Sequence, residues 1–157
     1  MSKYLISMLL LSSCYLYGQQ TSAPQGLSVK DSLPKANQKM LDFTEMKMGE
    51  KIGNGICADF VRAAMDYAVG SPVWFSDRKL DLRRELIMPG DILYMSWKRG
   101  RKSHVAVVIE VIERHKVLVA HQNFNRMKYV VTSTYNLRDK IKEGRKVVIY
   151  RPEGERK

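Results

Sequence analysis

Residues 103–124 of this chain read SHVAVVIEVIERHKVLVAHQNF. Two runs rich in valine and isoleucine flank a short polar stretch, a pattern typical of two antiparallel strands joined by a turn. Pairing Ile112 with Val117 places the apolar side chains of one run opposite those of the other. A one-residue slip would move polar side chains into the core, so the pattern specifies the register and predicts a β-hairpin.

The two faces of this hairpin differ in polarity. One face is apolar, with Gln122 as its only polar member, and we expect it to pack in the core. The opposite face carries His104, His121 and Asn123, and in a uniform register Asn123 lies opposite Ala106, diagonal to His104. The hairpin therefore brings two imidazoles and an amide onto one face.

The rest of the chain predicts helices before the hairpin and further strands around it. The spacing of apolar residues indicates helices over 39–48 and 57–69, and β-rich runs cover 91–95, 129–134 and 146–151. Because helices come first and strands follow, we expect an α+β domain. Its N-terminal helices would pack on a mostly antiparallel sheet.

The N-terminus predicts export. A short positive start precedes an apolar run over 4–16 that is too short to span a bilayer, and Gly18 offers a cleavage point. We interpret 1–18 as a signal peptide and expect a periplasmic or secreted protein. In the alternative, the segment ending at Cys14 resembles a bacterial lipobox, and a lipidated Cys14 would anchor the protein.

The remaining length suits one domain. Cleavage after residue 18 leaves 139 of the 157 residues. Residues 19–37 are rich in Gln, Ser, Pro and Lys and predict a flexible leader, followed by a domain over 38–152 and a charged tail over 153–157. No other apolar run is long enough to cross a membrane, and we expect a monomer without an integral membrane span.

The chain is strongly basic. Its formal net charge is +11 at pH 7, and +10 once Lys3 leaves with the signal peptide. Such a charge implies anionic surroundings such as cell-wall polymers, lipid head groups or nucleic acid. Arg99 and Arg101, just before His104, could steer an anionic substrate, although a solvated turn is the simpler interpretation. No array of basic and aromatic residues predicts specific nucleic-acid binding.

Removal of the signal peptide leaves Cys57 without a partner for an internal disulfide. A lone thiol in an exported protein is either a small buried hydrophobe or a reactive group. Cys57 follows a loop with Gly53 and Gly55 and opens the helix predicted over 57–69. The helix N-terminus favours the thiolate, and we expect the glycines to let another segment approach the sulfur.

A thiol, an imidazole and a third polar group can together cleave an amide. The Cys57 thiolate would attack the carbonyl, His104 would protonate the leaving amine, and His121 or Asn123 would orient the imidazole. The Cys57 backbone N–H, with Asn54 as a weaker candidate, would stabilise the oxyanion. A metal site of Cys57, His104 and His121 is less favoured, because no closely spaced pair marks a zinc motif. No cofactor is expected.

Each of these residues also has a structural interpretation. Cys57 could pack as an inert core residue, and either histidine could be an ordinary strand residue. Trp74 is a candidate for a substrate groove, although burial in the core is the commoner use of such aromatics. Trp97 has the same two interpretations.

Four short segments, in the right order, resemble the CHAP and NlpC/P60 families of cysteine peptidoglycan hydrolases. They are similar to a nucleophile motif, a PGD-hydrophobic strand, a GHVAIV histidine strand and a SEQNYN segment, over 53–61, 89–93, 103–108 and 120–125. Together with a last strand over 147–152, the resemblance spans 39–152.

The resemblance implies a papain-like fold that cleaves amide bonds in cell-wall peptides, with Cys57 as nucleophile and His104 as base. Its partner would be peptidoglycan or another anionic cell-wall polymer. His121 stands where CHAP members often carry Glu, whereas NlpC/P60 members often use a third-position histidine. The subfamily therefore stays open, and so does the bond cleaved, that of an N-acetylmuramoyl-L-alanine amidase or a peptide endopeptidase.

Two other functions fit the same sequence. One is a non-catalytic cell-wall-binding or assembly protein on the same fold. The other is a toxin-type amidase or acyltransferase.

Overall fold

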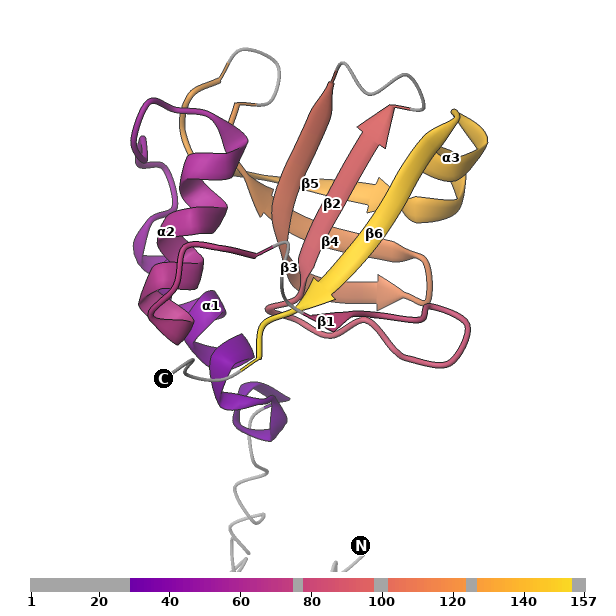
Figure 1. Ribbon diagram of the computed structural model, residues 1–157, viewed down its shortest axis with the longest axis horizontal. Helices are drawn as coiled ribbons and strands as arrows, with labels where there is room; N and C mark the ends of the chain where they lie inside the picture. Colours follow the sequence, from indigo (N-terminus) through magenta and orange to yellow (C-terminus); the bar gives the residue numbers. More distant parts are fainter. Residues whose placement is uncertain (1–28, 75–77, 98–101, 124–126, 154–157) are drawn as a thin grey trace, which may run out of the picture.

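Two packed helices and a curled six-stranded sheet make up the fold (Figure 1). The structure, a computed structural model, describes residues 29–74, 78–97, 102–123 and 127–153. The predicted signal peptide, most of the predicted leader and most of the charged tail lie outside these residues. So do Arg99 and Arg101.

The order of elements is two helices followed by strands. In chain order the elements are η1 (Val29–Ser32), α1 (Lys35–Met46), α2 (Cys57–Val69), β1 (Arg78–Lys79), β2 (Ile92–Trp97), β3 (Ser103–Glu113), β4 (Lys116–His121), β5 (Val131–Asn136), α3 (Leu137–Lys142) and β6 (Arg145–Arg151). The strand order is β1-β6-β2-β3-β4-β5, and every pair is antiparallel. The predicted α+β architecture with an antiparallel sheet is confirmed.

Helix α2 has the bounds that its apolar spacing predicts. Its buried stripe includes Phe60, Val61 and Ala64 and packs, with α1, on one face of the sheet. Gly70 ends the helix in the left-handed conformation, with φ of 68°, and its N–H donates to the Asp66 carbonyl.

Helix α1 begins earlier than predicted. It starts at Lys35 instead of 39, directly after Pro34, whose fixed φ suits a helix entry. Asn37 is fully buried, and its amide donates to the Pro89 carbonyl and to Asp91. The last residues of the predicted leader therefore belong to the folded domain, and the boundary predicted at 38 is too late.

Both faces of the sheet are buried, whereas the sequence predicted one core face and one polar face. Val107 faces the helices, but Ala106 and Val108 belong to a second apolar cluster with residues of β2, β4 and α3. Val111, which a uniform register would place on the same face as Val107, also joins this second cluster. The sheet curls strongly (Figure 1), so the strands can enclose a core on their second face.

Two β-bulges change the predicted register of the hairpin. Val107 pairs with Ala120, two residues from its partner in a uniform register, and the shifts lie after Val108 and after Val111. Because the total shift is two residues, side chains near the start of β3 and their neighbours on β4 still share the faces that the sequence predicted. Asn123 has left the strand with φ of 60° and does not pair with Ala106 as predicted.

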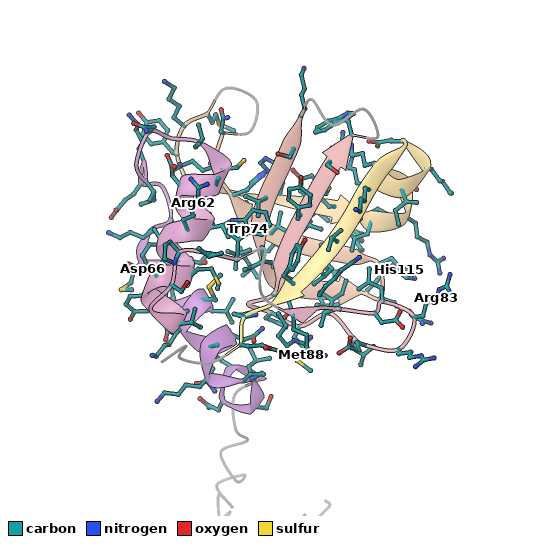
Figure 2. All side chains as sticks on the ribbon, viewed as in Figure 1. Arg62, Asp66, Trp74, Arg83, Met88 and His115 are labelled. Carbon is teal, nitrogen blue, oxygen red and sulfur yellow. The ribbon has the colours of Figure 1, made fainter. Side chains whose placement is uncertain are left out.

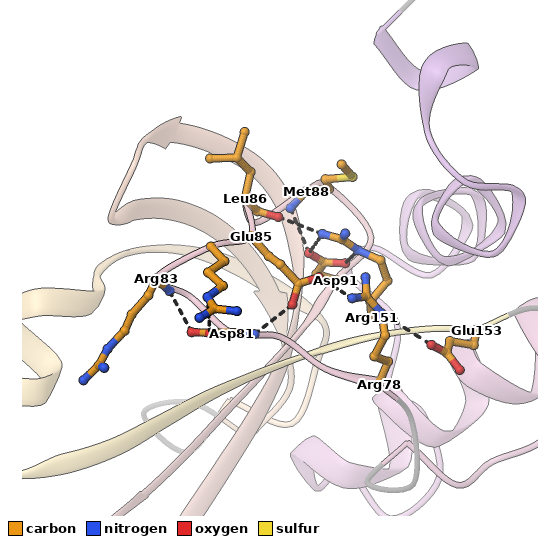
Figure 3. Close-up of polar contacts among 10 residues, drawn as sticks. Arg78, Asp81, Arg83, Glu85, Leu86, Met88, Asp91, Arg151 and Glu153 are labelled. Carbon is orange, nitrogen blue, oxygen red and sulfur yellow. Dashed lines mark hydrogen bonds and ion pairs between the residues drawn. The ribbon is translucent and has the colours of Figure 1, made fainter.

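A buried carboxylate joins three parts of the fold (Figure 3). Asp91 accepts two hydrogen bonds from the Arg151 guanidinium, at 3.0 and 2.9 Å, and others from the Asn37 amide and the Met88 N–H. Gly90 is required beside it, because its φ is 85° and an added Cβ would lie 2.5 Å from the Asn37 carbonyl oxygen. The cluster fixes α1, the turn before β2 and the end of β6 to one another.

We expect Asp91→Asn to lower the free energy of unfolding by about 3 kcal/mol or more, because it leaves the half-buried Arg151 without its counter-charge. Urea titration measures this. Asp139→Asn, at an exposed ion pair of 4.0 Å on α3, is the matched control and should change the same quantity by about 0.5 kcal/mol or less. Equal effects of the two substitutions would contradict a structural role for the Asp91 cluster.

Candidate active site

A pocket of about 510 Å³ collects residues that are far apart in the sequence. Three of the four predicted catalytic residues, Cys57, His104 and Asn123, line it. The other lining residues are Trp97, Lys102, Ser103, Tyr135 and Arg145. A separate hollow of about 330 Å³ beside α1 is mainly apolar and is lined by no cysteine or histidine.

Cys57 is the first residue of α2 and is half-buried. The loop before it folds around Asp59, whose carboxylate accepts the Asn54 N–H at 2.8 Å. Gly53 has a positive φ, and a Cβ there would lie 2.8 Å from that carboxylate, whereas a Cβ on Gly55 would meet Lys128. The glycines therefore serve the shape of the loop, and the expectation that they let a segment approach the sulfur is corrected.

Gln122 holds the Cys57 loop on the sheet. Its side-chain oxygen accepts the Ile52 N–H at 2.7 Å, and its amide nitrogen donates to the Ile52 and Ile56 carbonyls, both at 2.9 Å. The side chain is fully buried. Gln122, which follows His121, is thus hydrogen-bonded to Ile56, which precedes Cys57. This bond positions the N-terminus of α2 relative to the histidines.

The two predicted histidines are in direct contact. His104 Nε2 lies 2.7 Å from His121 Nδ1, and the rings meet edge to face. His121 Nε2 lies 2.9 Å from Ser133 Oγ, and the Tyr135 hydroxyl lies 3.3 Å from His121 Nδ1. Of the two candidates for orienting His104, the geometry therefore selects His121, while Asn123 lines the pocket.

Burial keeps this histidine pair neutral. Burial, together with the charge of Arg145, lowers the pKa of His104 to about 4. Burial, together with the charge of His104, lowers the pKa of His121 to about 4. Burial also raises the pKa of Tyr135 to about 12, so its hydroxyl stays protonated. At pH 7 both imidazoles therefore carry one proton each.

Two arrangements of protons fit these distances, because each imidazole nitrogen can donate or accept. In the arrangement that suits a base, His104 Nε2–H donates to His121 Nδ1, which also accepts from the Tyr135 hydroxyl, and His121 Nε2–H donates to Ser133 Oγ. This arrangement places the lone pair of His104 on Nδ1. A neutral imidazole with a lone pair is the form that can accept a proton from a thiol.

The remaining predicted residues lie elsewhere. Trp74 is buried between the helices and the sheet (Figure 2) and packs against Tyr94 and Tyr150, so its assignment to a substrate groove is corrected to a core role. Asn54 is exposed on the loop and does not line the pocket. Arg99 and Arg101 lie outside the described residues.

Sequence reasoning missed four residues around the histidines. They are Ser133 and Tyr135 on β5, Arg145 at the start of β6, and Gln122 in its clamping role. Ser133 and Tyr135 are two residues apart on a strand, a spacing that places both on one face. The pairing of β5 with β4, which the sequence does not show, brings that face to His121.

Two features are absent from the described residues. No group of three or more His, Cys, Asp or Glu side chains among them is placed to hold a metal ion. In the same ranges, no helix has the length and apolar character needed to cross a bilayer.

The histidine pair predicts a loss of stability in acid. The unfolded imidazoles bind protons below their ordinary pKa of 6.5, whereas the folded ones bind them only below about 4. Between these values the unfolded chain binds more protons, so the free energy of unfolding falls as the pH falls, on the order of 3 kcal/mol for one such histidine.

Urea titrations at pH 7.0, 5.5 and 4.5 measure this fall. We expect His104→Gln to make it clearly smaller. We expect a smaller effect from His115→Gln in the β3–β4 turn, where burial and two arginines also lower the histidine pKa but the side chain is far less buried. The same pH dependence in His104→Gln as in the unsubstituted protein would contradict a buried neutral pair.

Gln122 gives a second prediction. Gln122→Ala removes three hydrogen bonds and should lower the free energy of unfolding by about 3 kcal/mol, since buried backbone groups lose their partners. Exchange of the Ile52 amide hydrogen should also become faster. Gln38→Ala is the matched control, because Gln38 bonds only to the segment before α1. An Ile52 amide that stays equally protected would show that Gln122 does not hold the loop.

Two solved structures of Ly7917, one of them with the hydrolyzing product of MDP, match with a TM-score of 0.55 and 14% sequence identity. The match covers 74% of this chain and 62% of Ly7917, so this chain spans less than two thirds of that one. No curated protein matches the sequence.

The family comparison covers the residues that form the site. Residues 47–123 match the sequence model of the CHAP domain, and this range includes Cys57, His104, His121 and Asn123. These 77 of the 157 residues, just under half of the chain, are similar to the CHAP domain.

Proposed function

We propose that this protein is a cysteine hydrolase that cleaves amide bonds in peptidoglycan. One observation carries the proposal: Cys57, at the N-terminus of α2, shares a pocket with His104, whose ring is held by His121. The CHAP domain supports a peptidoglycan hydrolase in general, and so does the fold shared with Ly7917, which was solved with the hydrolyzing product of MDP.

The reaction would begin with proton transfer. His104 Nδ1 takes the proton of the Cys57 thiol, and the thiolate attacks the carbonyl carbon of the amide. The oxyanion that forms accepts a hydrogen bond from the Cys57 backbone N–H. The imidazolium then gives its proton to the leaving amine, and an acyl-enzyme thioester remains.

Hydrolysis of the thioester would complete the cycle. His104 Nδ1 takes a proton from a water molecule, whose oxygen attacks the thioester carbonyl. The second tetrahedral intermediate collapses, the carboxylic acid product leaves, and the thiolate regains its proton from the imidazolium. The helix N-terminus favours each negatively charged state of the sulfur.

His121 would act as a positioning residue through the whole cycle. As an acceptor at 2.7 Å it keeps the His104 ring oriented, with Nδ1 toward the pocket. The glutamate found at this place in many CHAP members would also stabilise the imidazolium by charge. A neutral histidine orients the base without that charge, and Ser133 and Tyr135 orient the histidine in turn.

Export would bring the enzyme to its substrate. The predicted signal peptide over 1–18 supports a periplasmic or secreted location, or a membrane-anchored one if Cys14 is lipidated. The net charge of +10 that remains after loss of Lys3 supports attraction to anionic wall polymers. The ends of the released fragments would identify the bond cleaved. It is either the N-acetylmuramoyl-L-alanine amide or a bond within the stem peptide.

The thiol mechanism predicts a large effect of Cys57→Ala. We expect release of soluble fragments from purified sacculi to fall on the order of 10⁴-fold, because the nucleophile is lost. Mass spectrometry of the digest measures the release and identifies the fragment ends. His115→Gln, outside the pocket, is the matched control and should retain full release. Equal release by Cys57→Ala and the unsubstituted protein would exclude the thiol mechanism.

A further inference from the structure

We propose that Arg145 and Lys102 form a carboxylate-binding subsite within the Cys57 pocket, which selects stem peptides that carry a free carboxylate near the scissile amide. This inference rests on the proposed function, because it names the chemical class of substrate for the same site. Both residues line the pocket. Neither follows from the motifs that the sequence shares with the family.

The strand register places the two cations on either side of Trp97. Trp97 of β2 pairs with Arg145 of β6 on one side, and its N–H donates to the Lys102 carbonyl on the other. Met95, two residues earlier on β2, pairs with His104. Residues that pair across antiparallel strands share a face. Arg145, Trp97 and Lys102 therefore form a row one step beyond His104.

The position of this row defines where the anion would sit. Two residues along a strand correspond to about 7 Å. An extended peptide covers that distance in about two residues. A carboxylate bound by this row would therefore be one of two groups. It would be the side-chain carboxylate of the residue next to the scissile amide, or a carboxylate of the residue after that one.

Arg145 is held in place without being neutralised. Its guanidinium lies over the Trp97 ring, 4.3 Å from the ring centroid, which restricts its orientation. Nη2 contacts Glu143 at 3.2 Å, but Glu143 also accepts from Lys140 at 2.9 Å. Within the described residues, the buried Nε of Arg145 makes no hydrogen bond. Because Nε is buried, a carboxylate in the pocket would bind the Nη groups of this oriented guanidinium.

The charge of the pocket favours an anionic ligand. Two of its described lining residues are basic and none is acidic. A guanidinium matches the planar geometry of a carboxylate, and hydrogen bonds between two charged groups are the strong ones. Because Arg145 is already oriented, a bound carboxylate would lose little side-chain entropy at this residue.

The test compares binding of two ligands that differ only in charge. The probes are N-acetylmuramoyl-L-alanyl-D-glutamic acid and its diamide, titrated into the full chain carrying Cys57→Ala, so that no cleavage occurs. We expect the acid to bind about tenfold or more tightly than the diamide. Adding Arg145→Gln should remove most of this difference, and adding Arg145→Lys should restore part of it.

Controls separate a specific subsite from general attraction. Arg138→Gln removes an exposed arginine on α3 and should leave the preference for the acid unchanged. Lys102→Gln should weaken the preference for the acid. The melting temperature shows whether Arg145→Gln folds, and if it does not, Lys102→Gln tests the subsite in its place. Equal binding of the two probes, binding of neither, or a preference that survives both substitutions would overturn the subsite.

Cleavage assays distinguish failure of this inference from failure of the proposed function. Incubating the unsubstituted protein with sacculi tests hydrolysis without reference to Arg145. Hydrolysis without a preference for the acid probe would overturn the subsite alone. A preference for the acid that depends on Arg145, with no hydrolysis of sacculi, would support the subsite and contradict the hydrolase.

Discussion

The Gln122 side chain fastens the loop before Cys57 to the strand that carries His121. Its three hydrogen bonds reach the Ile52 N–H and the carbonyls of Ile52 and Ile56. This contact helps to set the distance between Cys57, at the N-terminus of α2, and the two histidines, on which the geometry of the site depends. A buried amide with these partners is costly to disturb, and it acts together with the packing of Ile52 on the core and the backbone hydrogen bonds between Val130 and residues 49–50.

The curled sheet determines the state of the histidine pair. A flat sheet would leave the second face of β3 and β4 open to water, and the imidazoles would titrate near their ordinary pKa. Because the strands enclose a second core, His121 is fully buried and both histidines are neutral at pH 7. Ser133 and Tyr135 contact His121, and His104 is a neutral imidazole that lines the pocket.

Sequence periodicity correctly predicted the features that depend on a single helix or a single hairpin. The apolar spacing of 57–69 predicted α2 with the bounds that the structure shows, and alternation in the hairpin placed His104 and His121 on one face. Predictions that needed two elements were less successful. The bulges in β3, the burial of Asn37 against Asp91 and the core position of Trp74 arise from packing between segments that local periodicity does not relate.

The sequence by itself determined the α+β class, the position of Cys57 at a helix N-terminus and the shared face of the histidines, because these follow from periods of 3.6 and 2 residues. Only the tertiary structure decided that His121 contacts His104, that Gln122 holds the loop before Cys57, and that Arg145 lines the same pocket. These contacts join residues that lie far apart in the chain, and their geometry follows from strand order and curvature.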